Sequence, residues 1–416
     1  MTLLVRTTAA VVILAAGGIA AIGTMLRPRP SGLVIVTLDT TRADRLPAYG
    51  FGGVATPAID ALASHGAVFD EAVSVAPLTL PAHTSLFTGL YPPHHGVRDN
   101  SDHALDSAHS TLASLLHDRG FHTAAFVGAI VLSGDRGLAR GFDVYDDGRA
   151  PGTPPPRRRP GRDVVDRARA WIDGLDDKPF FLWVHLYDVH APQALPLEFR
   201  RAYGDRYEGG IAYVDDQIGR LLDTLGRRNR LANTVIVVAG DHGESLGEHG
   251  EQEHGIFLYE STLRVPLILC APGAAARRVP GVTSLVDIFP TVLHLLGVAE
   301  PARSDGVSLV PALTGGHLPE RPIYAESMYA AHFGWGTLRI VRDGGFKFID
   351  APRAELYDLD RDPLEQQNLA DAHFATVSAM QRELLSMNGA LSRQGDAAKL
   401  SPERLRALEA LGEIRR

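Results

Sequence analysis

Short apolar runs recur along the chain, and segments with helical spacing of apolar residues lie between them. A short continuous apolar run that is rich in β-branched residues is typical of a strand that is buried on both faces. We predict such strands at 33–38, 123–127, 180–186, 234–239 and 263–269. We predict helices at 58–65, 110–119, 164–175 and 207–225. This alternation predicts an α/β fold with a doubly wound, mostly parallel central sheet.

The pattern changes near Gly334, where two short predicted strands, 338–342 and 346–349, precede a helical segment. This change favours a small C-terminal α+β subdomain. We therefore divide the chain into an N-terminal segment with a linker (1–30), a catalytic domain (31–333) and a C-terminal subdomain with a helical tail (334–416). The proline- and arginine-rich segment 151–160 is predicted to be a loop, because it is incompatible with regular structure.

The N-terminus carries an apolar segment from Thr7 to Leu26 without a charged residue. Roughly 20 apolar residues are enough to span a bilayer. Arginines lie on both sides of the segment, so the positive-inside rule does not fix its orientation. We predict an uncleaved membrane anchor, and a cleaved signal peptide with a weak site at Ala20-Ala21 is the alternative. Both interpretations place the protein outside the cytoplasm, in the periplasm or at the cell surface.

Composition narrows the classes of function. The 416 residues carry a net charge of −8, so the overall charge gives no indication of a protein that binds nucleic acid. The single cysteine, Cys270, excludes an internal disulfide and a cysteine-rich metal site. It lies in an apolar run, and we interpret it as a buried core thiol.

Oxygen and nitrogen donors follow the predicted strands. Asp39 follows the first strand, Asp241 and His242 follow another, and Thr79 lies in a predicted loop after 72–76. The C-terminal ends of parallel strands meet at one edge of a sheet, so these side chains are expected together. A mixed Asp/His set suits zinc or manganese, and an all-oxygen set suits calcium or magnesium. The alternatives are that Asp39 is a helix cap and that Thr79 only begins a turn.

Five separated motifs resemble those of the sulfatase family, within the alkaline phosphatase superfamily. Residues 79–92 (TLPAHTSLFTGLYP) are similar to the signature in which Cys or Ser, any residue, Pro, Ser and Arg precede a Leu-Thr-Gly turn. The other motifs are LDTTRAD at 38–44, DHGE at 241–244, LYESTLRVPL at 258–267, and ELYDL at 355–359 with Asp362-Pro363 and Asn368-Leu369. The resemblance runs in order from about residue 33 to 369. It implies a single central sheet with metal at its C-terminal edge and the hydrolysis of sulfuric or phosphoric esters.

Several positions depart from the sulfatase pattern. Thr79 stands where a sulfatase has the Cys or Ser that becomes formylglycine, and a threonine cannot give that aldehyde because its β-carbon carries a methyl group. His83 replaces the arginine that steadies the nucleophile, and His254 replaces a later sulfate-binding lysine. Thr40 stands where sulfatases have a second acidic ligand. Residues 128–131 lack the lysine and histidine of the family's Gly-Lys-Trp-His segment.

At these positions the chain resembles nucleotide pyrophosphatases and phosphoethanolamine transferases, which use an unmodified threonine as the nucleophile. The transferases have a second histidine twelve residues after the Asp-His pair, as His254 follows His242, and two histidines five residues apart, as in His185 and His190. The resemblance implies Thr79 as nucleophile and His190 as leaving-group acid. It also implies one metal held by Asp39, Thr79, Asp241 and His242. A second metal or the substrate would be bound by residues among His254, His185, Asp188, His83 and Arg42. The cofactor is therefore predicted as one or two divalent ions of zinc, manganese or calcium.

A purely structural role stays open for three of these residues. His185 is compatible with a core strand position, His254 with a solvated flap, and Asp188 with a carboxylate that only orients a ligand. We predict a hydrolase whose ester substrate is a glycan, a lipid or a small aryl ester. The alternatives are a membrane-tethered phosphoethanolamine-type phosphotransferase and a non-catalytic binding protein with the same fold.

Overall fold

The computed structural model describes residues 29–388 except 102, 151 and 155. The predicted anchor at 7–26 and the predicted tail after 388 lie outside the described residues. Within the described part, no helix combines the length and the apolar character needed to cross a membrane.

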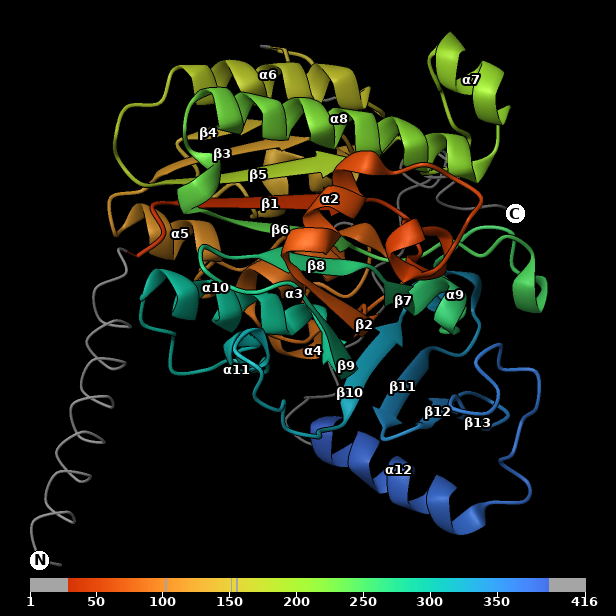
Figure 1. The fold of residues 1–416 in the computed structure, drawn as a ribbon. Helices are drawn as coiled ribbons and strands as arrows, with labels where there is room; N and C mark the ends of the chain where they lie inside the picture. Colours follow the sequence, from red (N-terminus) through yellow and green to blue (C-terminus); the bar gives the residue numbers. More distant parts are fainter. Residues whose placement is uncertain (1–28, 102, 151, 155, 389–416) are drawn as a thin grey trace, which may run out of the picture.

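A large mixed sheet lies at the centre of the molecule (Figure 1). Among the described residues it has nine strands in the order β4-β3-β5-β1-β6-β8-β2-β7, and β9 pairs with β2. The strands are β1 (Gly32–Leu38), β2 (Ala67–Val73), β3 (His122–Val127), β4 (Val144–Asp146), β5 (Phe180–Leu186), β6 (Thr234–Gly240), β7 (Arg264–Val265), β8 (Leu267–Cys270) and β9 (Arg277–Ser284). Strands β4, β3, β5, β1 and β6 are parallel, and β8 runs antiparallel to β6 and β2. The predicted mostly parallel α/β sheet is confirmed.

The apolar runs form strands because both faces of the sheet are covered. Successive residues of β1 alternate between two cores: Leu33 and Ile35 pack into one, and Val34 and Val36 into the other. Helices α3 (Thr79–Thr88), α5 (Leu112–His117), α10 (Ile288–Leu296) and α11 (Val310–Leu313) cover the first face, and α2 (Pro57–His65), α6 (Gly161–Asp173) and α8 (Tyr207–Arg227) cover the second. The remaining helices are α4 (Pro92–His95), α7 (Leu197–Tyr203) and α9 (Glu260–Leu263).

Two local predictions were wrong. Thr79 does not lie in a loop but is the first residue of helix α3. The predicted strand 263–269 is divided: α9 ends at Leu263, and Pro266 separates the short strands β7 and β8. Proline has no N–H to donate to a neighbouring strand, which explains the interruption.

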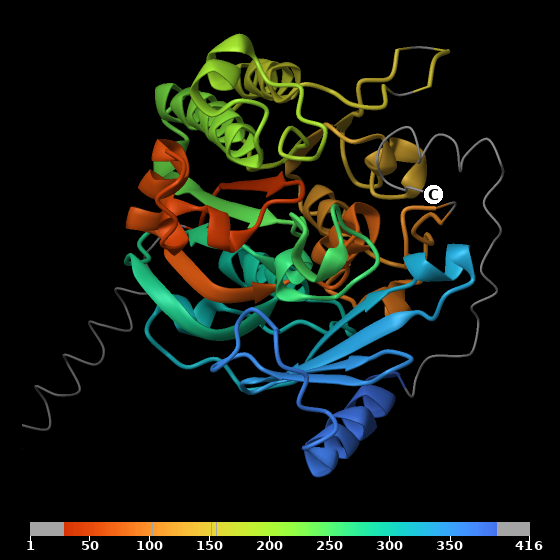
Figure 2. The ribbon, with the colours of Figure 1, turned by 90° about the vertical axis from the view of Figure 1, so that its right-hand side faces the viewer.

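A small antiparallel sheet completes the C-terminal part. Its strands are β10 (Ile323–Ser327), β11 (Leu338–Asp343), β12 (Phe346–Asp350) and β13 (Glu355–Asp358). Helix α12 (Phe374–Asn388) packs against β11 and β12 (Figure 1). The sheet begins with β10, before the change of sequence pattern at Gly334. The short helical segment η8 (Tyr329–Phe333) leads from β10 towards the edge where the central strands end (Figure 2).

Candidate active site

Four candidate ligands converge at the C-terminal edge of the central sheet. Asp39 follows β1, and Asp241 and His242 follow β6, the strand paired with it through Leu38 and Gly240. Thr79 reaches the same point from the N-terminus of α3, and all four side chains are fully buried. Donor atoms of Asp39, Asp241 and His242 lie within 4.8 Å of one another. Neighbouring strands that end in ligands therefore create the cluster.

The hydroxyl of Thr79 lies between two of these ligands. Its Oγ1 is 3.4 Å from Oδ2 of Asp39 and 3.2 Å from Nε2 of His242. The next residue, Leu80, donates its backbone N–H to Oδ1 of Asn100 at 2.9 Å. A helix N-terminus carries a partial positive charge, which stabilises negative charge at Thr79. The position favours an anionic oxygen or an anionic group of a substrate.

The surroundings of Asp241 suit a cation. Its Oδ1 accepts the backbone N–H groups of Thr40 (3.2 Å) and His242 (2.8 Å). Its buried Oδ2 has no hydrogen-bond donor among the described residues, and the imidazoles of His242 and His83 are 3.6 and 3.7 Å away. Burial, and then the negative charge of Asp39, raise the pKa of Asp241. Since buried carboxylates need a compensating charge, the donor set fits a divalent cation.

Four buried histidines share one orientation, with Nδ1 close to a backbone carbonyl. The pairs are His83 with Thr79 (2.7 Å), His190 with Ala191 (2.5 Å), His242 with Gly243 (3.0 Å) and His254 with Pro77 (2.9 Å). A carbonyl only accepts, so Nδ1 carries the hydrogen and Nε2 of the neutral ring carries the lone pair. Burial lowers the pKa of all four rings, that of His242 to about 3, which favours the neutral form. Metal-binding histidines are commonly held in this way.

His190 and His254 face each other beside this cluster. Their Nε2 atoms are 3.1 Å apart, and the ring of His254 is 4.3 Å from that of His242. Two lone-pair nitrogens at this distance suit a cation or a shared proton between them. Within the described part of the chain, however, Asp39, Asp241 and His242 form the one group of three or more His, Cys, Asp or Glu ligands.

His83 and His185 lie behind the cluster and meet at a buried hydroxyl. Oγ1 of Thr37 is 2.9 Å from Nε2 of His83 and 3.1 Å from Nδ1 of His185, and it accepts the indole N–H of Trp183 at 2.9 Å. Nε2 of His185 is 3.2 Å from Oδ2 of Asp39. The two rings therefore support Thr79 and Asp39 from the core side. Sequence reasoning missed Thr37, although it is the one polar residue in the run 33–38.

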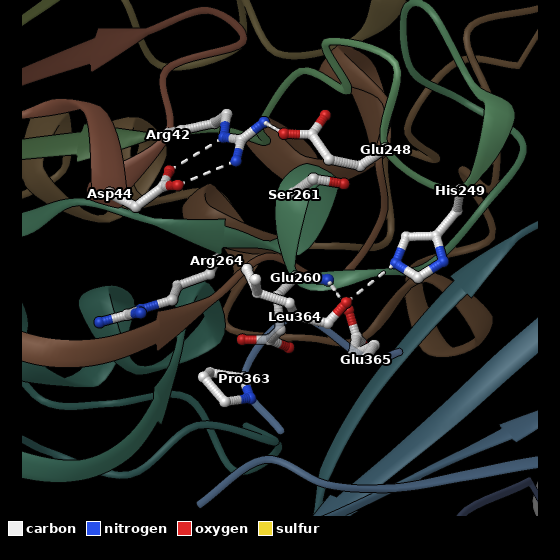
Figure 3. A pocket seen from close by; sticks show the side chains of 10 residues that line it. All are labelled: Arg42, Asp44, Glu248, His249, Glu260, Ser261, Arg264, Pro363, Leu364 and Glu365. Atoms are coloured by element: carbon white, nitrogen blue, oxygen red, sulfur yellow. Dashed lines mark hydrogen bonds and ion pairs between the residues drawn. The ribbon is translucent and has the colours of Figure 1, made fainter. Parts of the chain in front are cut away.

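Two further predicted residues have structural partners of their own. Oδ1 of Asp188 accepts the backbone N–H of Gly161 at 3.1 Å, and burial raises the pKa of this carboxyl to about 6. Arg42 forms ion pairs with Asp44 at 2.9 Å and Glu248 at 2.8 Å. Figure 3 shows Arg42 at a cavity of about 130 Å³ that none of the four ligand candidates lines. Arg42 thus ties the loop after β1 to the loop that carries His254.

The fold and the donors at the sheet edge define the alkaline-phosphatase-like class of ester hydrolases. The family model described as Sulfatase matches residues 32–298, which is most of the chain. A second model, N-sulphoglucosamine sulphohydrolase, C-terminal, matches residues 247–389. The chain belongs to the sulfatase family. The prediction of a hydrolase that acts on sulfuric or phosphoric ester bonds is confirmed.

Individual relatives agree with this family. The chain is 39% identical over 170 residues to a choline-sulfatase of Rhizobium meliloti, a match that spans 40% of this chain and 32% of that protein. It is 25% identical over 423 residues to the Delta 4,5-hexuronate-2-O-sulfatase of Bacteroides thetaiotaomicron, covering 85% and 87% of the two chains. The fold is similar to that of a phosphonate monoester hydrolase of Agrobacterium radiobacter, with a TM-score of 0.75, 23% identity and coverage of 88% and 96%.

Proposed function

We propose that this protein is a metal-dependent hydrolase that cleaves a sulfate or phosphate ester with the hydroxyl of Thr79 as nucleophile. The position of this hydroxyl carries the proposal: Oγ1 lies 3.4 Å from Asp39 and 3.2 Å from His242 at a helix N-terminus. A threonine cannot become formylglycine, because its β-carbon carries a methyl group. The unmodified hydroxyl of Thr79 is therefore the group available for attack.

Asp39, Thr79, Asp241 and His242 would hold the divalent cation. Zinc or manganese suits this mixed set of oxygen and nitrogen donors best, and calcium is the third candidate. When bound, such a cation lowers the pKa of a hydroxyl and withdraws charge from the ester oxygens. The His190–His254 pair is the proposed place of a second ion or of substrate oxygens.

The chemistry of the chain's own groups follows from this arrangement. Oγ1 of Thr79 loses its proton to solvent, and the N-terminus of α3 stabilises the resulting negative charge. The oxygen then forms a bond to phosphorus or sulfur while the bond to the leaving oxygen breaks. Nε2 of His190 carries a lone pair in the neutral ring, so it first takes up a proton that it shares with Nε2 of His254, 3.1 Å away, and then gives that proton to the leaving oxygen. Water then cleaves the phospho- or sulfothreonine and restores the hydroxyl.

The experiment is a parallel screen of aryl sulfate, phosphate monoester and phosphate diester with zinc, manganese and calcium, on wild type and Thr79 variants. Thr79→Ala should lower kcat/KM by about 10³-fold or more, because the nucleophile is lost. Thr79→Ser should retain part of the activity. Thr84→Ala is the matched control, since its hydroxyl lies in the same helix and, among the described residues, donates to the carbonyl of Leu80 at 2.7 Å and to no ligand candidate.

Three outcomes would redirect the proposal. Full activity of Thr79→Ala would show that another group is the nucleophile. A product that forms only when an acceptor alcohol is present would favour the phosphotransferase. A protein that binds no metal and cleaves no ester in the screen would favour a non-catalytic binding role.

We also propose an extracytoplasmic location, with residues 7–26 as a membrane anchor. The support is the uncharged apolar sequence of this segment. Cell fractionation of the full chain and of a chain without residues 1–30 tests the location: release of the shortened protein from the membrane is expected, and an unchanged distribution would contradict it.

The choice of substrates for the screen follows from a relative. Because one relative is named for a hexuronate sulfate, glycan esters are the first substrates to try, ahead of lipid and aryl esters.

A further inference from the structure

Arg158 lies in the wall beside His190, although it comes from the loop 151–160. Its guanidinium donates to the carbonyl of His190 at 2.7 Å and to the carbonyl of Pro192. It also lies 5.2 Å from the ring centre of Tyr187, and that ring stacks on His190 at 4.6 Å. The ring of Tyr187 therefore contacts both the guanidinium of Arg158 and the ring of His190, the proposed leaving-group acid.

The backbone of the loop explains this position. Arg158 forms an isolated antiparallel bridge with Ala129, and the N–H of Arg159 donates to the carbonyl of Gly128 at 3.1 Å. In extended chain, successive side chains point to opposite sides. Arg159 points into the protein and pairs with Asp146 at 3.0 Å, which fixes the loop. Arg158 points to the other side, where its guanidinium reaches the backbone carbonyls of His190 and Pro192, and Arg157 is exposed.

The charge of Arg158 has no carboxylate partner within 4.0 Å among the described residues, in contrast to that of Arg159. Asp188 is close enough to be affected by this charge but forms no ion pair with it. The partners of Arg158 are two carbonyls and an aromatic ring, and a guanidinium has five N–H groups. A half-buried guanidinium with donors to spare is suited to bind an oxyanion.

We propose that Arg158 is a substrate-binding residue that contacts an anionic group on the leaving part of the substrate. This inference rests on the proposed function, in which His190 protonates the leaving oxygen. Because Arg158 is bonded to the backbone of His190, the proposal places its remaining donors on the leaving-group side of the scissile bond. The substrate class is then an ester whose alcohol carries a further anionic group, such as a carboxylate or a second sulfate or phosphate.

The experiment compares two aryl esters of whichever acid the enzyme hydrolyses, one with a neutral 4-nitrophenyl leaving group and one with a carboxylate on the ring. In Arg158→Ala, the ratio of kcat/KM for the carboxylate ester to that for the neutral ester should fall about 10- to 100-fold, as expected for the loss of a charge-assisted hydrogen bond. Arg158→Lys should retain part of the preference. Arg157→Ala is the matched control: it removes the same charge from the neighbouring exposed position and should leave the ratio unchanged.

Two results would overturn the proposal. Equal losses for both esters in Arg158→Ala would mean that Arg158 only holds the loop around His190. An equal change of the ratio in Arg157→Ala would mean that general charge explains it. Calorimetric binding of the two esters in the Thr79→Ala background needs no turnover: a selective loss of affinity for the carboxylate ester on adding Arg158→Ala supports the contact, and no selective loss contradicts it, whatever the activity assay shows about Thr79.

Discussion

Two buried clusters of charge are neutralised in different ways. Between the central domain and the C-terminal sheet, the fully buried Lys347 places Nζ 3.0 Å from Glu260 and 2.8 Å from Glu365. Arg342 adds a second cation 3.3 Å from Glu260. In the active site, Asp241 is equally buried, but its ion-pair partners are imidazoles at 3.6 and 3.7 Å rather than a lysine or an arginine.

The difference shows where the fold supplies its own counter-charge. A buried carboxylate is costly unless it is paired, so the interface cluster carries lysine and arginine within the chain. Burial lowers the pKa of the imidazoles beside Asp241, so they are poor sources of positive charge. This contrast supports the proposal that the active site takes a cation from outside the chain, whereas the interface cluster has its counter-charge within the chain.

The largest expected effect comes from removing the charge of Asp241. Asp241→Asn should lower kcat/KM by about 10³- to 10⁴-fold, or ~4–5.5 kcal/mol, because a ligand is lost. The amide oxygen can still accept from Thr40 and His242, so the metal-free variant should be no less stable than the metal-free wild type. Activity assays, metal analysis and thermal unfolding measure this. A metal-free variant that is strongly destabilised would mean that Asp241 is a structural residue.

Removal of the Lys347 ammonium group tests whether the interface cluster depends on its own counter-charge. Lys347→Met should lower the free energy of unfolding by about 3 kcal/mol, because Glu260 and Glu365 lose a buried partner. Chemical denaturation measures the loss, and the double variant with Glu365→Gln should recover part of it. Metal content should stay at the wild-type level. A loss of metal in Lys347→Met would mean that the two clusters are coupled.

Metal removal should destabilise the wild type but not the Asp241 variant. A ligand present at 100 times its Kd stabilises a protein by ~2.7 kcal/mol, so a chelator should lower Tm and added metal should restore it. Lys347→Met should respond to the chelator as the wild type does. A chelator that leaves the wild-type Tm unchanged would contradict a cation site in the native protein.

The smallest effect concerns the ion pair between the buried Arg42 and Glu248, whose side chain is 34% exposed. Burial opposes ionisation, but the hydrogen bond and charge of Arg42 outweigh it and lower the pKa of Glu248 from 4.5 to about 2. A lowered pKa contributes stability above pH 4.5 that is lost as the pH falls towards 2. The stability difference between wild type and Glu248→Gln should be below about 1 kcal/mol at pH 6, because solvent screens the pair, and should vanish near pH 2. A difference that grows on acidification would contradict the assignment.

The sequence predicted the central strands better than the segments near the nucleophile. The run 180–186 coincides with β5, since both faces of that strand are buried. Strand β2 was missed, because Asp70 and Glu71 interrupt its apolar residues. Helix α3 was missed because all ten of its residues are buried, which leaves no polar face to show a helical period. Pro81 also looks like a break, yet it is tolerated in the first turn.

The ligand cluster followed from the sequence for a physical reason, and its supports did not. Asp39 and Asp241 follow strands that end at one edge of the sheet, so their proximity is a property of the fold class. The contact of His185 with Thr37 depends on the register of β1 with β5. The approach of Arg158 to His190 depends on the path of a loop. Neither contact leaves a periodic signal in the sequence.

The central claim is that Thr79, Asp39, Asp241 and His242 bind one common cation. The most direct measurement is anomalous X-ray diffraction from crystals soaked with zinc or manganese. The account predicts a peak in bonding distance of all four side chains, about 2.0–2.2 Å from the nitrogen and carboxylate donors. A site that stays empty at saturating metal, or a peak that leaves the hydroxyl of Thr79 without contact, would contradict it.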